Sequence, residues 1–127
     1  MAQFLSEEHM AMGTAGLNED AGFAAAMTNV DLGLQFNVTD APDGEIDYYL
    51  TVGDGAAVMA LGTLEDADAS VSSDYETAAA IAKGELNVQM AFMTGKIKVG
   101  GNMAKVMMYQ GLINEFARVS STLDLDY

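Results

Sequence analysis

Residues 31–52 read DLGLQFNVTDAPDGEIDYYLTV, with hydrophobic side chains at every second position on both sides of a central turn. This alternation is typical of two strands that each bury one face. Pro42 and Gly44 supply the bend, so the stretch predicts a β-hairpin. Its two strands cover 31–39 and 45–52. The positions predicted to face the core are Leu32, Leu34, Phe36 and Val38 in the first strand and Ile46, Tyr48, Leu50 and Val52 in the second.

The sequence after the hairpin predicts further strands. Asp54 and Gly55 form a pair that is favoured in tight antiparallel connections, and they lead into AAVMALG at 56–62. The first three strands would therefore form an antiparallel meander. Residues 68–73, DASVSS, predict a weaker and more polar fourth strand.

A fifth strand is predicted at 96–99, within the segment TGKIKVGGNMAKVMM at 94–108. Isoleucine and valine alternate there with lysines, which a protected edge strand carries on its outer face. The two following glycines, Gly100 and Gly101, would let the strand turn sharply into a helix, for which Asn102 is a good N-cap.

Helices are predicted between and around these strands. The first 27 residues predict one or two short amphipathic helices with a glycine break at 13–16. Asp74 can cap a further helix, which Gly84 is placed to stop. A short helix is predicted at 85–94.

The last helix is predicted to start near Asn102 and to carry a hydrophobic stripe. Because helices would cover one apolar face of a five-stranded sheet, the fold class is α+β. No internal repeat or linker is visible, so residues 1–127 are expected to form a single domain. The stripe consists of Val106, Tyr109, Ile113 and Phe116, with Met103 and Met107 beside it.

Charge is distributed unevenly along the chain. Residues 1–82 contain 15 acidic residues and no Lys or Arg, whereas residues 83–127 contain 4 acidic residues and all 5 basic ones, for a net charge of -14. Such a surface repels nucleic acid and anionic lipid over about a Debye length, so no nucleic-acid partner is expected. Any contact with a membrane surface would use the C-terminal half.

Hydropathy indicates a folded protein that is not integral to a membrane. The longest apolar run, 56–61, is far too short to cross a bilayer, and the N-terminus MAQFLSEEH has acids where a secretory signal has Lys or Arg. These features predict a cytoplasmic protein. The absence of cysteine excludes disulfides, thiolate metal sites and thiol catalysis.

The sequence offers no catalytic, metal or cofactor motif. His9 is the only histidine, has no nearby nucleophile, and is expected to be an exposed helix residue. Asp40, Asp43, Glu45 and Asp47 crowd a turn, but their spacing does not fit a calcium loop, which favours a solvated hairpin tip. The glycine pairs lack the context of a phosphate-binding loop.

Methionine is unusually abundant, with 10 residues in the chain. Methionine fills irregular space and re-packs at low cost, so a concentration of it indicates either ordinary core packing or the lining of an adjustable cavity. Five of the methionines fall within residues 90–108, namely Met90, Met93, Met103, Met107 and Met108.

Residues 85–112, ELNVQMAFMTGKIKVGGNMAKVMMYQGL, resemble the C-terminal signature of the sterol-carrier-protein (type 2) lipid-transfer family. The resemblance is specific over 68–112 and compatible in pattern over 28–67. The residues that match the signature are Asn87, Gln89, Ala91, Phe92, Gly95, Lys96, Ile97, Lys98, Val99, Gly101, Asn102 and Met103, followed by Met107, Gln110 and Leu112.

The resemblance implies an apolar tunnel between sheet and helices that holds a sterol, fatty acid, fatty acyl-CoA or phospholipid and transfers it without catalysis. The chain departs from many members in being acidic and in ending LDY rather than in a peroxisomal tail. It also has no N-terminal arginine to pair with a carboxylate, which favours a neutral ligand.

The tunnel-lining residues expected from the strand faces and the methionine helices form one set. In this hypothesis Met103 and Met107 roof the cavity, and Gln110 or Tyr109 meets the polar group of the ligand. The full set is Phe36, Ile46, Tyr48, Leu50, Met59, Met90, Phe92, Met93, Met103, Met107, Tyr109, Gln110 and Ile113.

Three other functions remain open at this point. The domain could deliver a lipidic substrate to a partner enzyme of lipid metabolism. It could be a small isomerase that uses a buried Asp or Tyr, or a dimerisation domain with no cavity.

Overall fold

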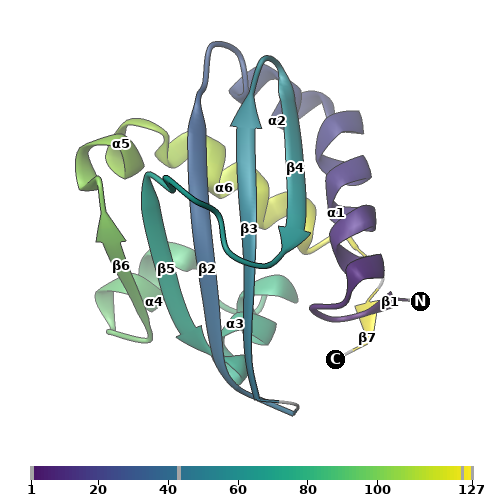
Figure 1. The fold of residues 1–127 in the computed structure, drawn as a ribbon, viewed down its shortest axis with the longest axis vertical. Helices are drawn as coiled ribbons and strands as arrows, with labels where there is room; N and C mark the ends of the chain where they lie inside the picture. The colour runs from purple at the N-terminus through teal and green to yellow at the C-terminus, as the bar shows by residue number, and fades with distance from the viewer. Residues whose placement is uncertain (1, 43, 124, 127) are drawn as a thin grey trace.

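In residues 2–42, 44–123 and 125–126, which the computed structural model describes, five strands form one mixed sheet in the order β4-β3-β2-β5-β6. The helices lie against one face of this sheet (Figure 1), so the predicted α+β class and its five strands are confirmed. The strands are β2 (Leu32–Ala41), β3 (Gly44–Gly53), β4 (Ala56–Leu61), β5 (Ala69–Asp74) and β6 (Ile97–Gly101).

The hairpin of β2 and β3 is the centre of the sheet. Its antiparallel register places Leu34 opposite Leu50 and Phe36 opposite Tyr48, as the alternation predicts. Leu34 and Leu50 are buried, whereas Phe36 and Tyr48 on the same face are only half-buried. The middle of the inner face is therefore less tightly covered than its ends. Asp43 of the predicted turn lies outside the described residues.

The edge strand β4 is closed by side chains of α1 (Glu7–Glu19). The Asn18 amide donates to the Ala57 carbonyl oxygen at 2.8 Å and accepts from the Ala57 N–H at 2.9 Å. One turn earlier, the Thr14 hydroxyl oxygen accepts from the Met59 N–H at 2.8 Å. Residues four apart share a helix face, so α1 satisfies backbone groups that an open edge would expose. At the opposite edge, β6 carries the exposed Lys98.

The predicted glycine break at 13–16 is wrong, because α1 continues through Gly13 and Gly16. A Cβ at Gly13 would collide with the sulfur of Met59, so this glycine allows close approach of the helix to the sheet. The break lies at Asp20, which ends α1 and caps α2 (Ala21–Ala26) by accepting from the Phe23 N–H at 2.9 Å.

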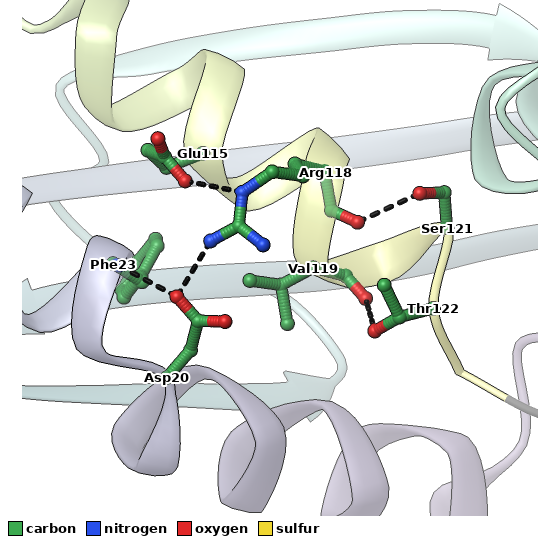
Figure 2. Close-up of polar contacts among 7 residues, drawn as sticks. All are labelled: Asp20, Phe23, Glu115, Arg118, Val119, Ser121 and Thr122. Carbon is green, nitrogen blue, oxygen red and sulfur yellow. Dashed lines mark hydrogen bonds and ion pairs between the residues drawn. The ribbon is translucent and has the colours of Figure 1, made fainter.

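Asp20 also anchors the C-terminal helix α6 (Gln110–Ser120). Figure 2 shows the Arg118 guanidinium between two carboxylates, 2.6 Å from Asp20 Oδ1 and 2.6 Å from Glu115 Oε2. The hydrogen bond from Arg118, followed by that from the Phe23 N–H, holds the pKa of Asp20 below its usual value. One carboxylate thus joins the α1–α2 corner to α6.

The two middle helices each begin directly after the residue that caps them. Helix α3 (Tyr75–Ala82) begins after Asp74, which accepts from the Thr77 N–H at 2.7 Å, and Gly84 follows it with φ +78°. This confirms the predicted start and stop. Helix α4 (Val88–Met93) begins later than the predicted 85–94, because Asn87 is the residue that caps it.

The single last helix predicted from Asn102 is in fact two helices. Asn102 caps α5 (Met103–Met108) as expected, but the backbone leaves the helix at Tyr109, with φ -103° and ψ 24°. No proline marks the position, although the weak helix former Gly111 follows. The break lets α5 lie past the end of β6 while α6 crosses behind the sheet (Figure 1).

The ends of the described chain pair with each other, which the sequence pattern did not predict. Strands β1 (Ala2–Gln3) and β7 (Leu125–Asp126) are parallel neighbours, and the Phe4 N–H donates to the Asp126 carbonyl oxygen at 2.8 Å. Two-residue strands are too short for periodicity to detect. Tyr127, at the end of the sequence, lies outside the described residues.

Strand β6 includes the two glycines that were predicted to follow it, and of these only Gly101 requires its lack of a side chain. Its φ is +94°, and a Cβ would come within 2.7 Å of the Asp68 carbonyl oxygen and 2.8 Å of the Ala69 Cα. We expect Gly101→Ala to lower the free energy of unfolding by about 1–3 kcal/mol, measured by urea denaturation. Gly100→Ala is the matched control, since its Cβ would lie 3.5 Å from the Ser70 hydroxyl. Equal stability of the two variants would contradict a steric requirement for glycine at position 101.

Candidate functional site

A cavity of about 140 Å³ lies between the inner face of the sheet and the helix layer. Strands β2, β3 and β4 contribute Phe36, Tyr48 and Met59 to its walls. Helix α3 contributes Ala78 and Ile81, and α6 contributes Phe116. We call this space the inner cavity.

A second cavity of about 260 Å³ lies among α4, β6, α5 and α6, and we call it the outer cavity. The two cavities share wall residues, so they adjoin each other. Together they extend from the N-terminal segment near Phe4 to the α4–α5 side of the molecule. The shared residues are Val88, Ile97, Val99, Val106 and Ile113.

Aromatic rings form part of the wall of the inner cavity. Phe36 stacks on Tyr48 with ring centroids 4.7 Å apart, and Phe116 approaches Phe36 at 5.8 Å. Burial raises the pKa of the Tyr48 hydroxyl above its ordinary value, so this group is neutral at pH 7. Phe36 and Tyr48 are half-buried on the core face, and besides each other they border the open space of the inner cavity.

His9 lies at the far end of the inner cavity, and the expectation that it is exposed is wrong. Only 4% of its surface is exposed, and its Nδ1 accepts from the Leu5 N–H at 2.9 Å. Leu5 has φ +63°, so the chain turns back before α1 and brings this ring inward against Phe4. Burial lowers the pKa of His9 to about 4.

The outer cavity is bordered by exposed hydrophobic side chains. Phe92 and Met93 on α4, and Met103 and Met107 on α5, line the cavity and also reach solvent; Met93 is 80% exposed. We call these four residues the rim. The polar lining residues of the outer cavity are the amides Gln89, Gln110 and Asn114.

The start of α5 is fixed while its later residues are exposed. Lys105 pairs with Asp68 at 3.1 Å, and the other carboxylate oxygen of Asp68 accepts from the Gly33 N–H at 2.8 Å. By contrast, Met107 and Met108 are 67% and 70% exposed. Part of the outer wall is therefore held by few contacts, as is typical of segments that open locally.

Nine of the thirteen residues predicted to line a tunnel border one of the two cavities. On the inner cavity these are Phe36, Tyr48, Met59 and Ile113; on the outer cavity they are Phe92, Met93, Met103, Met107 and Gln110, with Ile113 shared.

The other four predicted residues border neither cavity. Leu50 is buried in the hydrophobic core. Ile46 and Tyr109 are partly buried and pack against that core. Met90 is 54% exposed on α4. Strand alternation identifies the face on which a residue lies, but it does not separate a residue that touches the core from one that touches empty space.

The sequence pattern did not identify several wall residues. Ala78, Ile81 and Ala82 come from α3, and Phe4 and His9 come from the N-terminal segment. The run TAAAIA carries a usable signal, because small side chains on a core-facing helix leave space beneath them. Nothing in the local sequence of His9 indicates that it turns inward.

Within the described ranges, no group of three or more His, Asp or Glu residues is placed to hold a metal ion. No helix in that part of the chain is long and apolar enough to cross a membrane.

Acidification is expected to destabilise the fold through His9. The pKa of this group is about 4 in the native state against an ordinary value of 6.5, so between these pH values the unfolded chain binds the extra proton. The stabilisation is complete above pH 6.5 and is lost as the pH falls toward 4, by up to roughly 3 kcal/mol. Carboxylates titrate in part of this window, so the measurement compares urea unfolding of the wild type and His9→Phe from pH 8 to 4.5. Parallel curves would show that His9 is not buried in its neutral form.

Comparison with known proteins places this architecture in a family. The sequence model of the SCP-2 sterol transfer family matches residues 16–114, more than half of the chain. Sterol carrier protein 2 of Gallus gallus is 32% identical over 78 residues, which cover 61% of this chain and 14% of that protein. The match thus spans only a small part of the relative.

Solved structures share the fold over nearly the whole chain. The crystal structure of a sterol carrier protein 2 has a TM-score of 0.83 at 22% identity, covering 96% of this chain and 100% of that one. The solution structure of palmitated SCP2L2 from Aedes aegypti has a TM-score of 0.58 at 18% identity, covering 95% and 97% of the two chains. On the match over residues 16–114, this chain belongs to the SCP-2 sterol transfer family.

Proposed function

We propose that residues 1–127 form one domain that binds a single lipid-like molecule in the two adjoining cavities and transfers it without covalent chemistry. The observation that carries this proposal is the shared wall, which joins an apolar space between the sheet and the helices to one bordered by exposed methionines. Membership of the SCP-2 sterol transfer family supports it.

The volumes of the two cavities limit the size of the ligand and where it can lie. The inner cavity alone, at about 140 Å³, is close to the ~150 Å³ space that accepts a molecule such as benzene. Ligand pockets usually begin near ~300 Å³, so a lipid must occupy both the inner and the outer cavity. Left empty, the inner cavity costs roughly 3 kcal/mol at ~24 cal/mol per Å³. Transfer of about ten methylenes from water contributes roughly 8 kcal/mol, which exceeds that cost before association is counted.

The rim provides a route of entry. Helices α4 and α5 have 6 residues each, and their exposed methionines have flexible side chains that re-pack easily. In this proposal the rim parts to admit the ligand and closes after it leaves. The nine predicted residues that border the cavities are the proposed ligand contacts.

The lining favours a neutral buried group. No Lys, Arg, Asp or Glu is among the described residues that border either cavity. A carboxylate drawn inside would have no opposite charge, and burial of an unpaired ion is strongly unfavourable. A sterol fits this condition, whereas a phospholipid or fatty acyl-CoA would leave its charged group outside the rim. The same lining gives no support to an isomerase that uses a buried Asp.

A second function, delivery of a lipidic substrate to a partner enzyme, is favoured by one observation. The match covers only 14% of the Gallus gallus relative, so domains of this kind occur within much longer proteins. Acting in trans on an enzyme would use the same cavity and the same rim.

Native mass spectrometry of the protein purified from its own host tests the main proposal. We expect one neutral lipid class, identified after organic extraction, at close to one molecule per chain. Ligand-free protein that also fails to take up fluorescent sterols and fatty acids at micromolar concentration would contradict the proposal.

Blocking the shared wall is expected to abolish uptake. Val106→Trp adds bulk where the cavities meet, and we expect at least a tenfold loss of affinity for a fluorescent sterol. Met108→Trp is the matched control on the same helix, since Met108 is 70% exposed and lines neither cavity. The chain has no other tryptophan, so each variant also reports ligand contact by fluorescence. Overpacking typically costs about 1–3 kcal/mol, so unfolding curves accompany both measurements. Equal uptake by the two variants would contradict the route.

A further inference from the structure

The imidazole of His9 has one nitrogen committed and one available. Its Nδ1 accepts from the Leu5 N–H at 2.9 Å, so in the neutral ring the proton is assigned to Nε2. Burial keeps the ring neutral at pH 7. Nε2 is therefore a donor and not an acceptor.

Nε2 has no hydrogen-bond partner among the described residues. Among the described residues, every enclosed side-chain nitrogen or oxygen has a hydrogen-bond partner. The only hydrogen bond found for the His9 ring in that part of the chain is the one to Nδ1. Nε2 must therefore adjoin space rather than protein, and a ring that is 4% exposed and lines the inner cavity adjoins that space.

The other polar groups on the inner wall are hydroxyls. Tyr48, Ser73 and Ser120 can each donate or accept, whereas neutral His9 with Nδ1 occupied can only donate. A ligand that ends in a methyl group beside His9 would remove Nε2–H from water and give it no partner. Leaving a buried donor unpaired is unfavourable, so the position selects for an acceptor.

We propose that His9 donates a hydrogen bond from Nε2 to a neutral oxygen, such as a ketone or ester carbonyl or a hydroxyl, on the inner end of the ligand. This inference rests on the proposed function and narrows its ligand class. The ligand enters with a neutral polar end first, so an oxygen-tipped apolar molecule is preferred over a plain hydrocarbon end.

Two ligands of equal chain length test the donor in the wild type. We compare 2-hexadecanone with hexadecane, each delivered from the same cyclodextrin, in competition against a fluorescent lipid. One hydrogen bond predicts a preference of roughly fivefold to tenfold for the ketone. Because His9 is the only histidine, [¹⁵N]histidine labelling gives one pair of ring nitrogens, and Nε2 should shift with the ketone and not with the alkane.

The outcomes separate the two proposals. If both ligands bind equally and Nε2 shifts with neither, the His9 inference is overturned and the binding function stands. If neither ligand nor the fluorescent lipid binds, the proposed function is overturned and the inference with it.

Variants of His9 provide a second reading. His9→Phe keeps an aromatic ring but removes both nitrogens, including the acceptor for Leu5. In His9→Asn, the side-chain oxygen Oδ1 is separated from the backbone by the same number of bonds as Nδ1 of histidine. This variant can therefore still accept from the Leu5 N–H, but it has no Nε2. We expect both variants to bind the two ligands within about twofold of each other, and the exposed Glu8→Ala to keep the wild-type preference. A ketone preference retained by a folded His9→Phe, which has no side-chain donor, would overturn the inference.

Discussion

The structure depends on one constraint: the helices do not cover the whole apolar inner face of the sheet with tightly packed side chains. Along the inner face of the β2–β3 hairpin, Leu50 is buried by neighbouring side chains, and Leu34 opposite it is buried at the wall of the inner cavity. Phe36 and Tyr48, next along the same face, stack on each other and border open space. Apolar surface of this kind is stabilised by any apolar molecule that covers it. The open middle of the sheet thus connects the fold to the proposed binding function.

The two sides of the molecule hold this space differently. On one side, α1 closes the β4 edge through Thr14 and Asn18, and Asp20 joins the α1–α2 corner to Arg118 of α6. On the other side, the short helices α4 and α5 present exposed methionines over the outer cavity. In the proposed function, the wall held by hydrogen bonds keeps the shape of the cavity while the loosely held wall admits the ligand.

Much of the fold was predictable because local rules determine it. The hairpin, the turn before β4 and the Asp74 cap follow from alternation, turn chemistry and capping. The wrong prediction at Gly13 depends on contact with the distant Met59, whereas those at Tyr109 and His9 depend on backbone turns at Tyr109 and Leu5 that no proline or glycine marks. Phe36, Tyr48 and Met59 on the strands were predicted from sequence, whereas Val71 and Val99 on β5 and β6 and the alanines of α3 were not, because the pattern gives the face of an element and not the position of the open space.

The central claim is that the layer between sheet and helices is hollow and apolar. Diffraction from a crystal held under xenon pressure tests this directly, since xenon occupies dry apolar cavities without requiring a polar contact. Ordered xenon beside Phe36, Tyr48 and Phe116 is the expected result. Electron density showing this space filled by the protein's own side chains, with no xenon bound, would contradict the account.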